Sequence, residues 1–214
     1  MHRPKVAVID YGMGNLLSVQ RGLEHVGADV CITSDPERIL AAERVVLPGV
    51  GAFPDAMGEL VSRKLVDVIL SAARNNTPLL GICLGMQILF ESSQEFKETV
   101  GLGLIDGRVV PLPPVGTDGS SHKIPHVGWS ALQPSGKSAW TDGVLAEIDP
   151  GEAAYFVHSF MAQPQAPESR IADCYCNGIP VAAVVGRGRV IGCQFHPEKS
   201  GDVGLRILRR FISF

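Results

Sequence analysis

Short apolar runs alternate with amphipathic stretches through the first half of the chain. The runs are rich in Val, Ile and Leu, whereas the stretches between them repeat apolar residues at helical spacing. Strands that alternate with helices in this way favour a parallel sheet covered on both faces. We predict strands at 6–9, 29–32, 44–47 and 79–82, and helices at 15–26, 60–74 and 84–90.

The second half of the chain lacks this alternation. Strand-like runs follow one another, separated by turn residues that favour antiparallel pairing. The fold class predicted from the whole pattern is α/β: a mostly parallel open sheet with helices on both faces plus an antiparallel C-terminal sheet, in a single domain of residues 1–214. The predicted later elements are strands at 154–157, 171–175, 181–185 and 189–195, a hairpin turn at 186–188, an exposed loop at 111–121 and a helix at 203–211.

Composition narrows the class of protein without naming a chemistry. A formal net charge of -3 over 214 residues gives no reason to expect a nucleic acid or an anionic membrane as partner. No apolar run is long enough to span a bilayer, and the N-terminal apolar run is too short for a signal peptide, so we expect a cytoplasmic protein. The five cysteines show no zinc-site spacing, and we expect neither a metal site nor a cofactor.

The stretch Gly81-Ile-Cys-Leu-Gly85 has the pattern of a nucleophile elbow. In such an elbow the nucleophile occupies a tight turn between a strand and a helix, and flanking glycines relieve crowding. A thiol at Cys83 would stand at a helix N-terminus, which favours the thiolate, and the N–H of Leu84 would face a developing oxyanion. The alternative is a buried structural cysteine.

Two further motifs follow predicted strands. In "QFHPEKS", His196 comes directly after a strand and Glu198 could hold its imidazole in one tautomer, although an ordinary surface loop is the alternative. In "LPGVGAF", glycines flank Val50 and would let the backbone aim N–H groups at negative charge, although a plain turn is the alternative. Because all three motifs end strands of one predicted parallel sheet, we expect them along the same edge.

Together these blocks resemble the class I (triad) glutamine amidotransferases. "PGVG", "GICLGMQ" and "HPE" match that family's oxyanion strand, nucleophile elbow and base loop, in the family's order. The blocks "VIDYGMGNLLSV", "KIPHVGW" and "YFVHS" extend the likeness to the glutaminase subunits of imidazole glycerol phosphate synthases, and the matching blocks span nearly the whole chain.

The resemblance implies hydrolysis of L-glutamine to L-glutamate and ammonia. The ammonia would pass to a separate (β/α)₈-barrel cyclase subunit, forming a heterodimer that makes imidazole glycerol phosphate and an aminoimidazole carboxamide ribotide in histidine biosynthesis. The family pattern makes Cys83 the nucleophile, His196 the base and acid, and Glu198 the orienting carboxylate. It places Val50, Gly51 and Leu84 at the oxyanion hole, and Gly49, Gly51, Gln87, Ser159 and Phe160 around glutamine.

Other readings remain open at this point. The chain could supply ammonia to a different synthase, could be a catalytically inactive regulatory module, or could be a cysteine peptidase on a similar sheet. We also hypothesise that the "PGVG" peptide turns its N–H inward only when the partner is loaded, because its glycines permit both orientations. His126 and His158 could be ligands or second bases, but we favour structural histidines.

Overall fold

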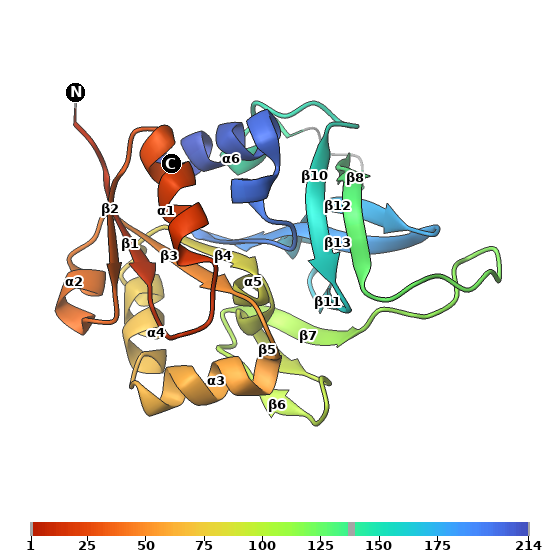
Figure 1. Ribbon diagram of the computed structural model, residues 1–214, viewed down its shortest axis with the longest axis horizontal. Coiled ribbons are helices and arrows are strands. Elements are labelled where there is room, and N and C mark those ends of the chain that lie inside the picture. The colour runs from red at the N-terminus through yellow and green to blue at the C-terminus, as the bar shows by residue number, and fades with distance from the viewer. Residues whose placement is uncertain (1, 137–139, 214) are drawn as a thin grey trace.

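The computed structural model describes residues 2–136 and 140–213 and is built around an eight-stranded sheet (Figure 1). The strand order is β2-β1-β3-β4-β14-β13-β12-β9. Pairing is parallel from β2 to β14 and antiparallel from β14 to β9, so the antiparallel strands extend the parallel sheet. These strands are β1 (Lys5–Ile9), β2 (Asp29–Thr33), β3 (Arg44–Gly49), β4 (Leu79–Cys83), β9 (Gln133–Pro134), β12 (Arg170–Cys176), β13 (Ile179–Arg187) and β14 (Val190–Cys193).

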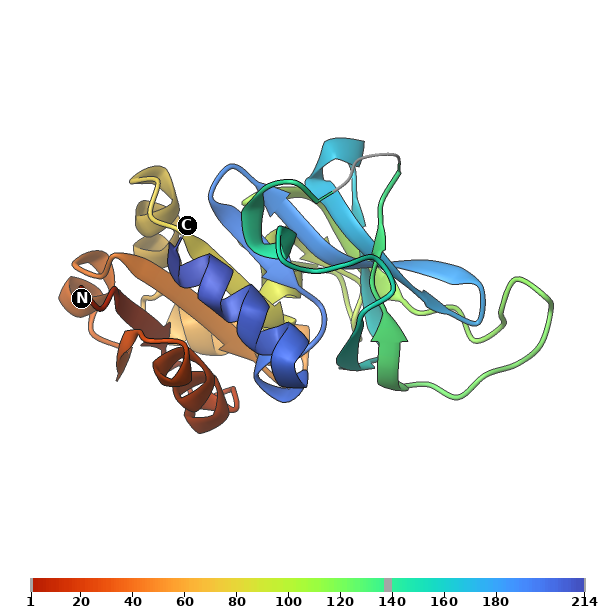
Figure 2. The same cartoon turned by 90° about the horizontal axis from the view of Figure 1, so that it is seen from above.

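Helices cover both faces of the parallel part, as predicted (Figure 2). Along β1, Val6 and Val8 pack against the helices of one face, whereas Ala7 and Ile9 pack against those of the other, because successive strand residues point to opposite sides. The first face carries α1 (Leu16–His25) and α6 (Gly201–Ser213), and the second carries α2 (Pro36–Leu40), α3 (Phe53–Ser62), α4 (Val66–Arg74) and α5 (Leu84–Ile88).

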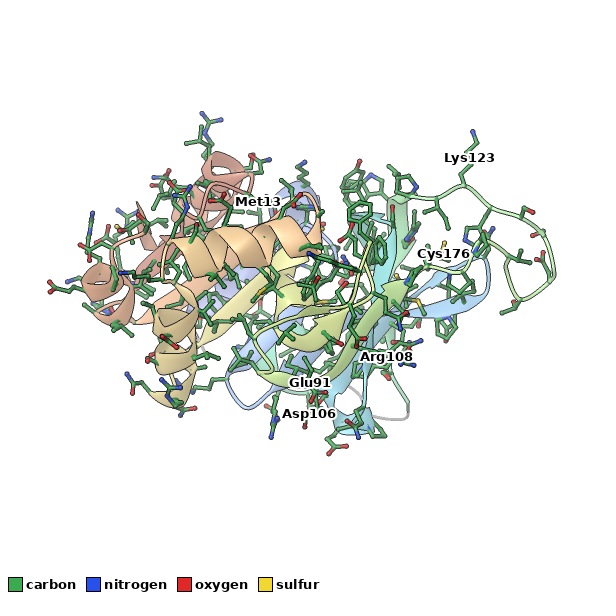
Figure 3. The ribbon with its side chains drawn as sticks, turned by 90° about the horizontal axis from the view of Figure 1, so that it is seen from below. Met13, Glu91, Asp106, Arg108, Lys123 and Cys176 are labelled. Carbon is green, nitrogen blue, oxygen red and sulfur yellow. The ribbon has the colours of Figure 1, made fainter. Side chains whose placement is uncertain are left out.

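Two smaller sheets stand beside the central one. A four-stranded sheet has the order β11-β7-β5-β6, and a two-stranded ribbon pairs β8 with β10 in antiparallel register. Figure 3 shows Lys123 projecting from the loop between β7 and β8. The additional elements are β5 (Phe90–Ser93), β6 (Thr99–Val100), β7 (Ile105–Pro111), β8 (His126–Ala131), β10 (Ala153–His158), β11 (Phe160–Pro164), and short 3-10 turns η1 (Gly143–Leu145), η2 (Pro167–Ser169) and η3 (Pro197–Lys199).

The single helix predicted at 60–74 is wrong, because the chain forms two helices there. The first helix ends at Ser62, and Lys64 takes a left-handed conformation with φ of 57°. The N–H of Leu65 then donates to the carbonyl of Leu60 at 2.9 Å, which closes the helix end. Leu65 is fully buried, so the helical apolar spacing continues across the break.

Other boundaries also differ from the prediction. The helix predicted at 84–90 ends at Ile88, and Phe90 begins a strand of the small sheet. The strand predicted to stop before Pro48 continues to Gly49, because Pro48 and Gly49 still pair with the last residues of β4. The sequence patterns did not reveal α2, β5 to β9 or β11.

Both ends of the described chain meet beneath the start of the sheet. The ring Nε2 of His2 lies 3.0 Å from a carboxylate oxygen of Glu43, and the Arg44 guanidinium donates to the carbonyl of Phe211. Arg44 begins β3 and Phe211 lies in the last turn of α6, so these ends lie opposite the carboxyl ends of the strands. No helix among the described residues is both long and apolar enough to cross a membrane.

Candidate active site

Cys83 occupies a strained turn between β4 and α5. It is the last residue of the strand and the N-cap of the helix, with φ of 55° and ψ of -112°, a region that non-glycine residues rarely adopt. A Cβ added to Gly85 would stand 1.8 Å from the carbonyl oxygen of Leu47, and one on Gly81 would stand 2.7 Å from the carbonyl oxygen of Gly85. The flanking glycines therefore let the helix start directly against the neighbouring strand, with the thiol at the strand end.

His196 and Glu198 form a buried pair just after β14. The imidazole Nδ1 lies 2.8 Å from the Glu198 Oε1, and the two side chains are 3% and 1% exposed. Burial alone would lower the pKa of His196, but interactions with Cys83 and Glu198 outweigh it and raise that pKa to about 9. The second carboxylate oxygen of Glu198 is buried and has no hydrogen-bond partner among the described residues.

The backbone of His196 is clamped to β10. Its N–H donates to the carbonyl of Tyr155 at 3.0 Å. The buried hydroxyl of Ser200 donates to the carbonyl of His196 at 2.7 Å and accepts the N–H of Tyr155 at 2.9 Å. Sequence reasoning did not single out Ser200, whose role depends on a strand contact far away in the chain.

The expectation that the three motifs share one edge is confirmed by the strand register. Gly49 pairs with Cys83 across β3 and β4, and Ile82 pairs with Cys193 across β4 and β14. The carboxyl ends of three adjacent parallel strands therefore present the "PGVG" turn, the elbow and the histidine loop together. Open α/β sheets commonly hold ligands at this edge.

The "PGVG" turn is held from behind by the loop after β1. The buried hydroxyl of Tyr11 donates to the carbonyl of Pro48 at 2.8 Å. A Cβ on Gly49 would lie 2.6 Å from that hydroxyl oxygen. Gly51 has a left-handed φ of 103°, and a Cβ there would lie 2.7 Å from the side chain of Met13. Gly49 is therefore required by its neighbours, and Gly51 by its left-handed backbone.

A cavity of about 370 Å³ opens in front of the thiol. Every expected site residue lines it except Gly49 and Glu198, which lie behind the turn and behind the imidazole respectively. Four lining residues were not expected, and they come from loops and from the β10 strand. The full lining is Val50, Gly51, Cys83, Leu84, Gln87, Glu95, Pro125, Val157, His158, Ser159, Phe160 and His196.

The amide of Gln87 is oriented by two hydrogen bonds. Its nitrogen donates to the carbonyl of Phe160 at 3.1 Å and to the side-chain oxygen of Gln194 at 2.9 Å. The nitrogen of Gln194 lies in turn 3.8 Å from the Cys83 sulfur. Because both amide hydrogens of Gln87 are used, its carbonyl oxygen is the atom left to meet a ligand.

Glu95 is the one acidic residue of this lining and was missed from sequence. It is 9% exposed and accepts a hydrogen bond from the N–H of Phe53 at 2.7 Å. Burial raises its pKa, although the hydrogen bond from Phe53 lowers it. The surrounding polar run "SSQEFKE" resembles any exposed loop, so its sequence carried no signal.

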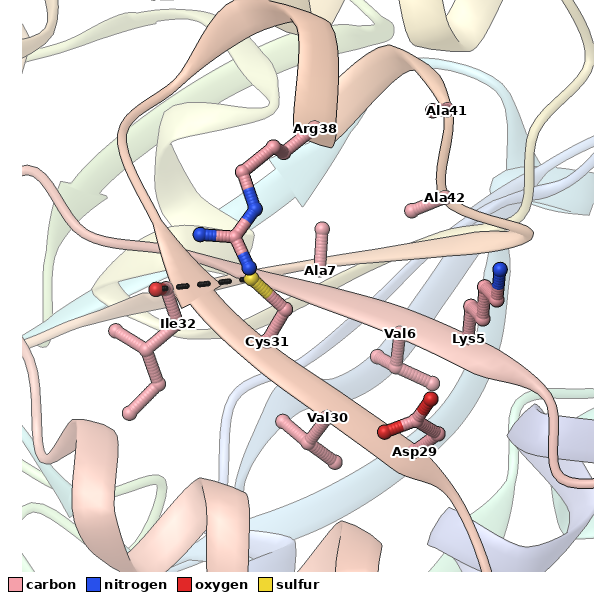
Figure 4. A pocket seen from close by; sticks show the side chains of 10 residues that line it. All are labelled: Lys5, Val6, Ala7, Asp29, Val30, Cys31, Ile32, Arg38, Ala41 and Ala42. Carbon is pink, nitrogen blue, oxygen red and sulfur yellow. Dashed lines mark hydrogen bonds between the residues drawn. The ribbon is translucent and has the colours of Figure 1, made fainter.

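A second hollow of about 560 Å³ lies apart from these motifs (Figure 4). It follows β1 and the edge strand β2, with Arg38 of α2 beside Cys31. The Cys31 sulfur lies 3.8 Å from the carbonyl of Ile32. None of the strand-end motifs contributes to its lining, so the cavity at Cys83 is the candidate active site.

The chain is similar to known proteins over nearly its whole length. The family model "Glutamine amidotransferase class-I" matches residues 7–213. Imidazole glycerol phosphate synthase subunit HisH 1 of Legionella pneumophila (strain Lens) is 48% identical over 208 residues, which cover 97% of this chain and 98% of the relative. Subunit HisH of Geobacillus thermodenitrificans is 48% identical over 207 residues, covering 97% and 94%.

The fold comparison points the same way. A solved structure of PurLQS from Thermotoga maritima has a TM-score of 0.70 with 20% identity, over 99% of both chains, which shows likeness of fold alone. The α/β fold predicted from sequence is thereby confirmed. The chain belongs to the class I glutamine amidotransferases and, among them, to the HisH subunits of imidazole glycerol phosphate synthase.

Proposed function

We propose that this chain hydrolyses L-glutamine to L-glutamate and ammonia, with Cys83 as nucleophile, His196 as base and acid, and Glu198 as the carboxylate that orients the imidazole. One observation carries the proposal: a strained elbow thiol and a buried imidazole–carboxylate pair line or back the same cavity. A thiolate is a strong nucleophile toward an amide carbonyl, and a histidine beside it can both take and return a proton.

The reaction proceeds in two halves. The Cys83 sulfur adds to the carboxamide carbon, and His196 gives a proton to the departing nitrogen, so that ammonia leaves and a thioester remains. A water molecule, deprotonated by His196, then attacks the thioester carbon, and the sulfur leaves as thiolate while glutamate is released. The raised pKa of His196, about 9, favours at neutral pH the protonated form that the first half requires.

Oxyanion stabilisation falls to main-chain groups at two strand ends. The N–H of Leu84 is at the first turn of α5, where backbone donors have no intrahelical acceptor. The Val50–Gly51 peptide lines the cavity opposite, and Val50 is 43% exposed. This peptide would turn its N–H toward the oxyanion only when the cyclase has bound its nucleotide substrate. Loss of one such donor costs other acyl-transfer enzymes about 10²–10³ in rate.

Glutamine is held by the remaining lining. The main chains of Gly51, Ser159 and Phe160 and the side-chain oxygen of Gln87 meet its polar groups, with Gly49 shaping the turn behind them. Glu95 lies where it complements the α-ammonium of the amino acid, because that group is the substrate's cation and Glu95 is the lining's carboxylate.

The partner is a cyclase subunit that consumes the ammonia to make imidazole glycerol phosphate. The relatives are named as synthase subunits, which supports a second chain. The outer face of the β8–β10 ribbon offers a docking surface: Val127 and Trp129 are 56% and 59% exposed, and Tyr155 packs edge-on against Trp129 with ring centroids 6.0 Å apart. Tyr155 also clamps the His196 backbone, so this surface adjoins the catalytic loop.

Glutamine-dependent turnover tests the proposal. We expect glutamate release by the chain with its cyclase and the cyclase's nucleotide substrate, transfer of the ammonia into product, and loss of both in Cys83→Ala. A glutamine analogue that alkylates thiols should label Cys83 in the wild type. Glutamate release by Cys83→Ala at the wild-type rate would refute the proposed nucleophile, and ammonia that reaches a different synthase but not the cyclase would refute the proposed partner.

A further inference from the structure

A pair of histidines next to the cavity plays no part in the triad. His158 ends β10 and lines the cavity, and His126 faces it from β8 in direct cross-strand register. The His126 Nδ1 lies 3.0 Å from the His158 Nε2. The ring of His126 stacks on Phe156, with centroids 5.5 Å apart and planes 23° apart, so packing fixes the ring plane.

The surroundings assign a tautomer to both rings. The His158 Nδ1 lies 2.9 Å from the carbonyl oxygen of Phe160, which can only accept, so this nitrogen carries the proton. Burial lowers the pKa of His158 to about 4, so the ring is neutral and its Nε2 accepts a hydrogen bond. The Nδ1 of His126 must then be the donor, and its Nε2 accepts from the hydroxyl of Ser130 at 3.0 Å.

The chain of hydrogen bonds continues beyond Phe160 to the reacting sulfur. The Phe160 carbonyl also accepts from Gln87, which bonds Gln194, whose nitrogen faces Cys83. Two donors therefore converge on one carbonyl, from His158 on one side and from Gln87 on the other. Loss of the His158 donor would release both the main chain at 159–160 and the amide of Gln87.

We propose that His126 and His158 are positioning residues that hold the Phe160 carbonyl, and through it the main chain of Ser159 and the amide of Gln87, in the arrangement that receives glutamine. This inference rests on the proposed glutaminase activity. The histidines touch neither the thiol nor His196 by any hydrogen bond described above, so they act on the binding of glutamine more than on the chemical step.

Matched substitutions of His126 test this inference in the complete enzyme with its cyclase. His126→Leu removes the donor, and we expect KM for glutamine to rise about tenfold, the loss typical of one neutral hydrogen bond, with kcat within about twofold. His126→Asn places its side-chain nitrogen where Nδ1 stood and should restore KM to within about twofold. Ser130→Ala removes only the outermost donor and should raise KM about twofold, and the surface variant His25→Leu should leave KM unchanged.

A spectroscopic readout is independent of activity. Nitrogen-15 NMR of the wild-type imidazoles at pH 7 should show both rings neutral with the proton on Nδ1, the minor form of free histidine. Should His126→Leu fail to fold, His126→Gln, whose amide lies at the Nε2 position, replaces it with the same expected rise in KM.

The outcomes separate this inference from the proposed function. An unchanged KM in His126→Leu or His126→Gln, or an Nε2-protonated or charged ring in the wild type, overturns the positioning role. A fall in kcat with unchanged KM would place the pair in the chemical step and also overturns it. A wild-type complex without glutaminase activity refutes the function proposed above, while the NMR measurement still decides the tautomers.

Discussion

The two walls of the cavity differ in how deeply their strands are buried. One wall consists of the ends of adjacent parallel strands, which are buried on both faces and carry the thiol, the imidazole and the carboxylate. The other is the two-stranded β8–β10 ribbon, whose residues alternate between half-buried and exposed on β8. The difference teaches that the thiol, the imidazole and the carboxylate stand on strands buried on both faces, whereas the ribbon that closes the other side of the cavity keeps an exposed outer face.

The buried histidines of the two walls show the same contrast. The pKa of His196 is raised to about 9, since Cys83 and Glu198 stabilise the imidazolium more than burial opposes it. The pKa of His158 falls to about 4, since burial dominates and its partners are a carbonyl and a second neutral ring. Thus one wall stabilises a charged imidazole, whereas the other keeps a neutral imidazole in one tautomer.

Of the changes that test this comparison, removal of the proposed nucleophile should have the largest effect. Cys83→Ala should lower glutaminase turnover by about 10⁴-fold or more, in line with removal of a triad nucleophile elsewhere. The control is Cys193→Ala on β14, a buried cysteine that pairs with Ile82, the residue before Cys83. Its steady-state turnover should stay within about tenfold of the wild-type value. Comparable losses in both variants would show that packing of this wall, and not the thiol of Cys83, controls turnover.

The rigidity of the strand-end wall can be tested through its glycines. Gly85→Ala would place a Cβ 1.8 Å from the Leu47 carbonyl oxygen, and we expect the free energy of unfolding to fall by about 3 kcal/mol or more. Gly58→Ala lies in α3 with open space around it and should instead raise that free energy by about 0.5–1 kcal/mol. Urea unfolding of both variants provides the measurement, and equal effects would contradict the close approach at Gly85.

The opposite pKa shifts of His196 and His158 predict that the two residues stabilise the fold over different pH ranges. His196 has a folded pKa above its unfolded value near 6.5, so its contribution is complete below pH 6.5 and is lost as pH rises through about 9. His158 has a folded pKa below that value, so its contribution is complete above pH 6.5 and is lost as pH falls through about 4.

The free energy of unfolding in urea, measured against pH for His196→Asn, His158→Asn and the wild type, separates the two contributions. The contribution of His196 changes between about pH 6.5 and 9, and that of His158 between about pH 4 and 6.5. Each variant should lose the pH dependence of one of these two ranges only, which amounts to about 3 kcal/mol for a pKa change of about 2.5. If the pH dependence of the unfolding free energy in one range stays unchanged when its histidine is replaced, other groups produce it.

Tyr11 should give the smallest effect of this set. Tyr11→Phe removes the hydrogen bond to the Pro48 carbonyl and leaves that buried oxygen without this donor, which should cost about 1–2 kcal/mol of stability. Because Pro48 precedes the "PGVG" turn, we also expect kcat to fall about fivefold with KM within twofold, as a loosened oxyanion donor would cause. The surface variant Tyr175→Phe serves as control, since Tyr175 is 55% exposed.

The strand-end wall could be predicted from sequence because its requirements are local. Short apolar runs identified β1, β3 and β4, and the glycines around Cys83 announced a turn too tight for a side chain. The placement of the three motifs along one edge followed from a single assumption, that their strands are parallel. The assigned roles of these residues remain proposals that the turnover experiments test.

Of the second wall only β10 was predicted, as the strand at 154–157, because the signals for β8 and for its pairing are long-range. The half-exposed β8 carries Gly128 and a polar mixture with no apolar run, and its pairing with β10 joins segments far apart in the chain. Glu95 lines the cavity from a polar loop, and Ser200 joins His196 to Tyr155, a residue far away in the chain. The break at Lys64 was hidden because the buried Leu65 mimics continued helical spacing.

The meeting of both chain ends beneath the sheet has a practical consequence. His2 and Phe211 lie by Glu43 and Arg44, at the pole of the molecule away from the thiol. Affinity handles, fluorophores or surface tethers attached near either of these residues would therefore leave the cavity at Cys83 and the exposed Trp129 unobstructed, and an immobilised form of the protein could be titrated with glutamine and with a candidate cyclase.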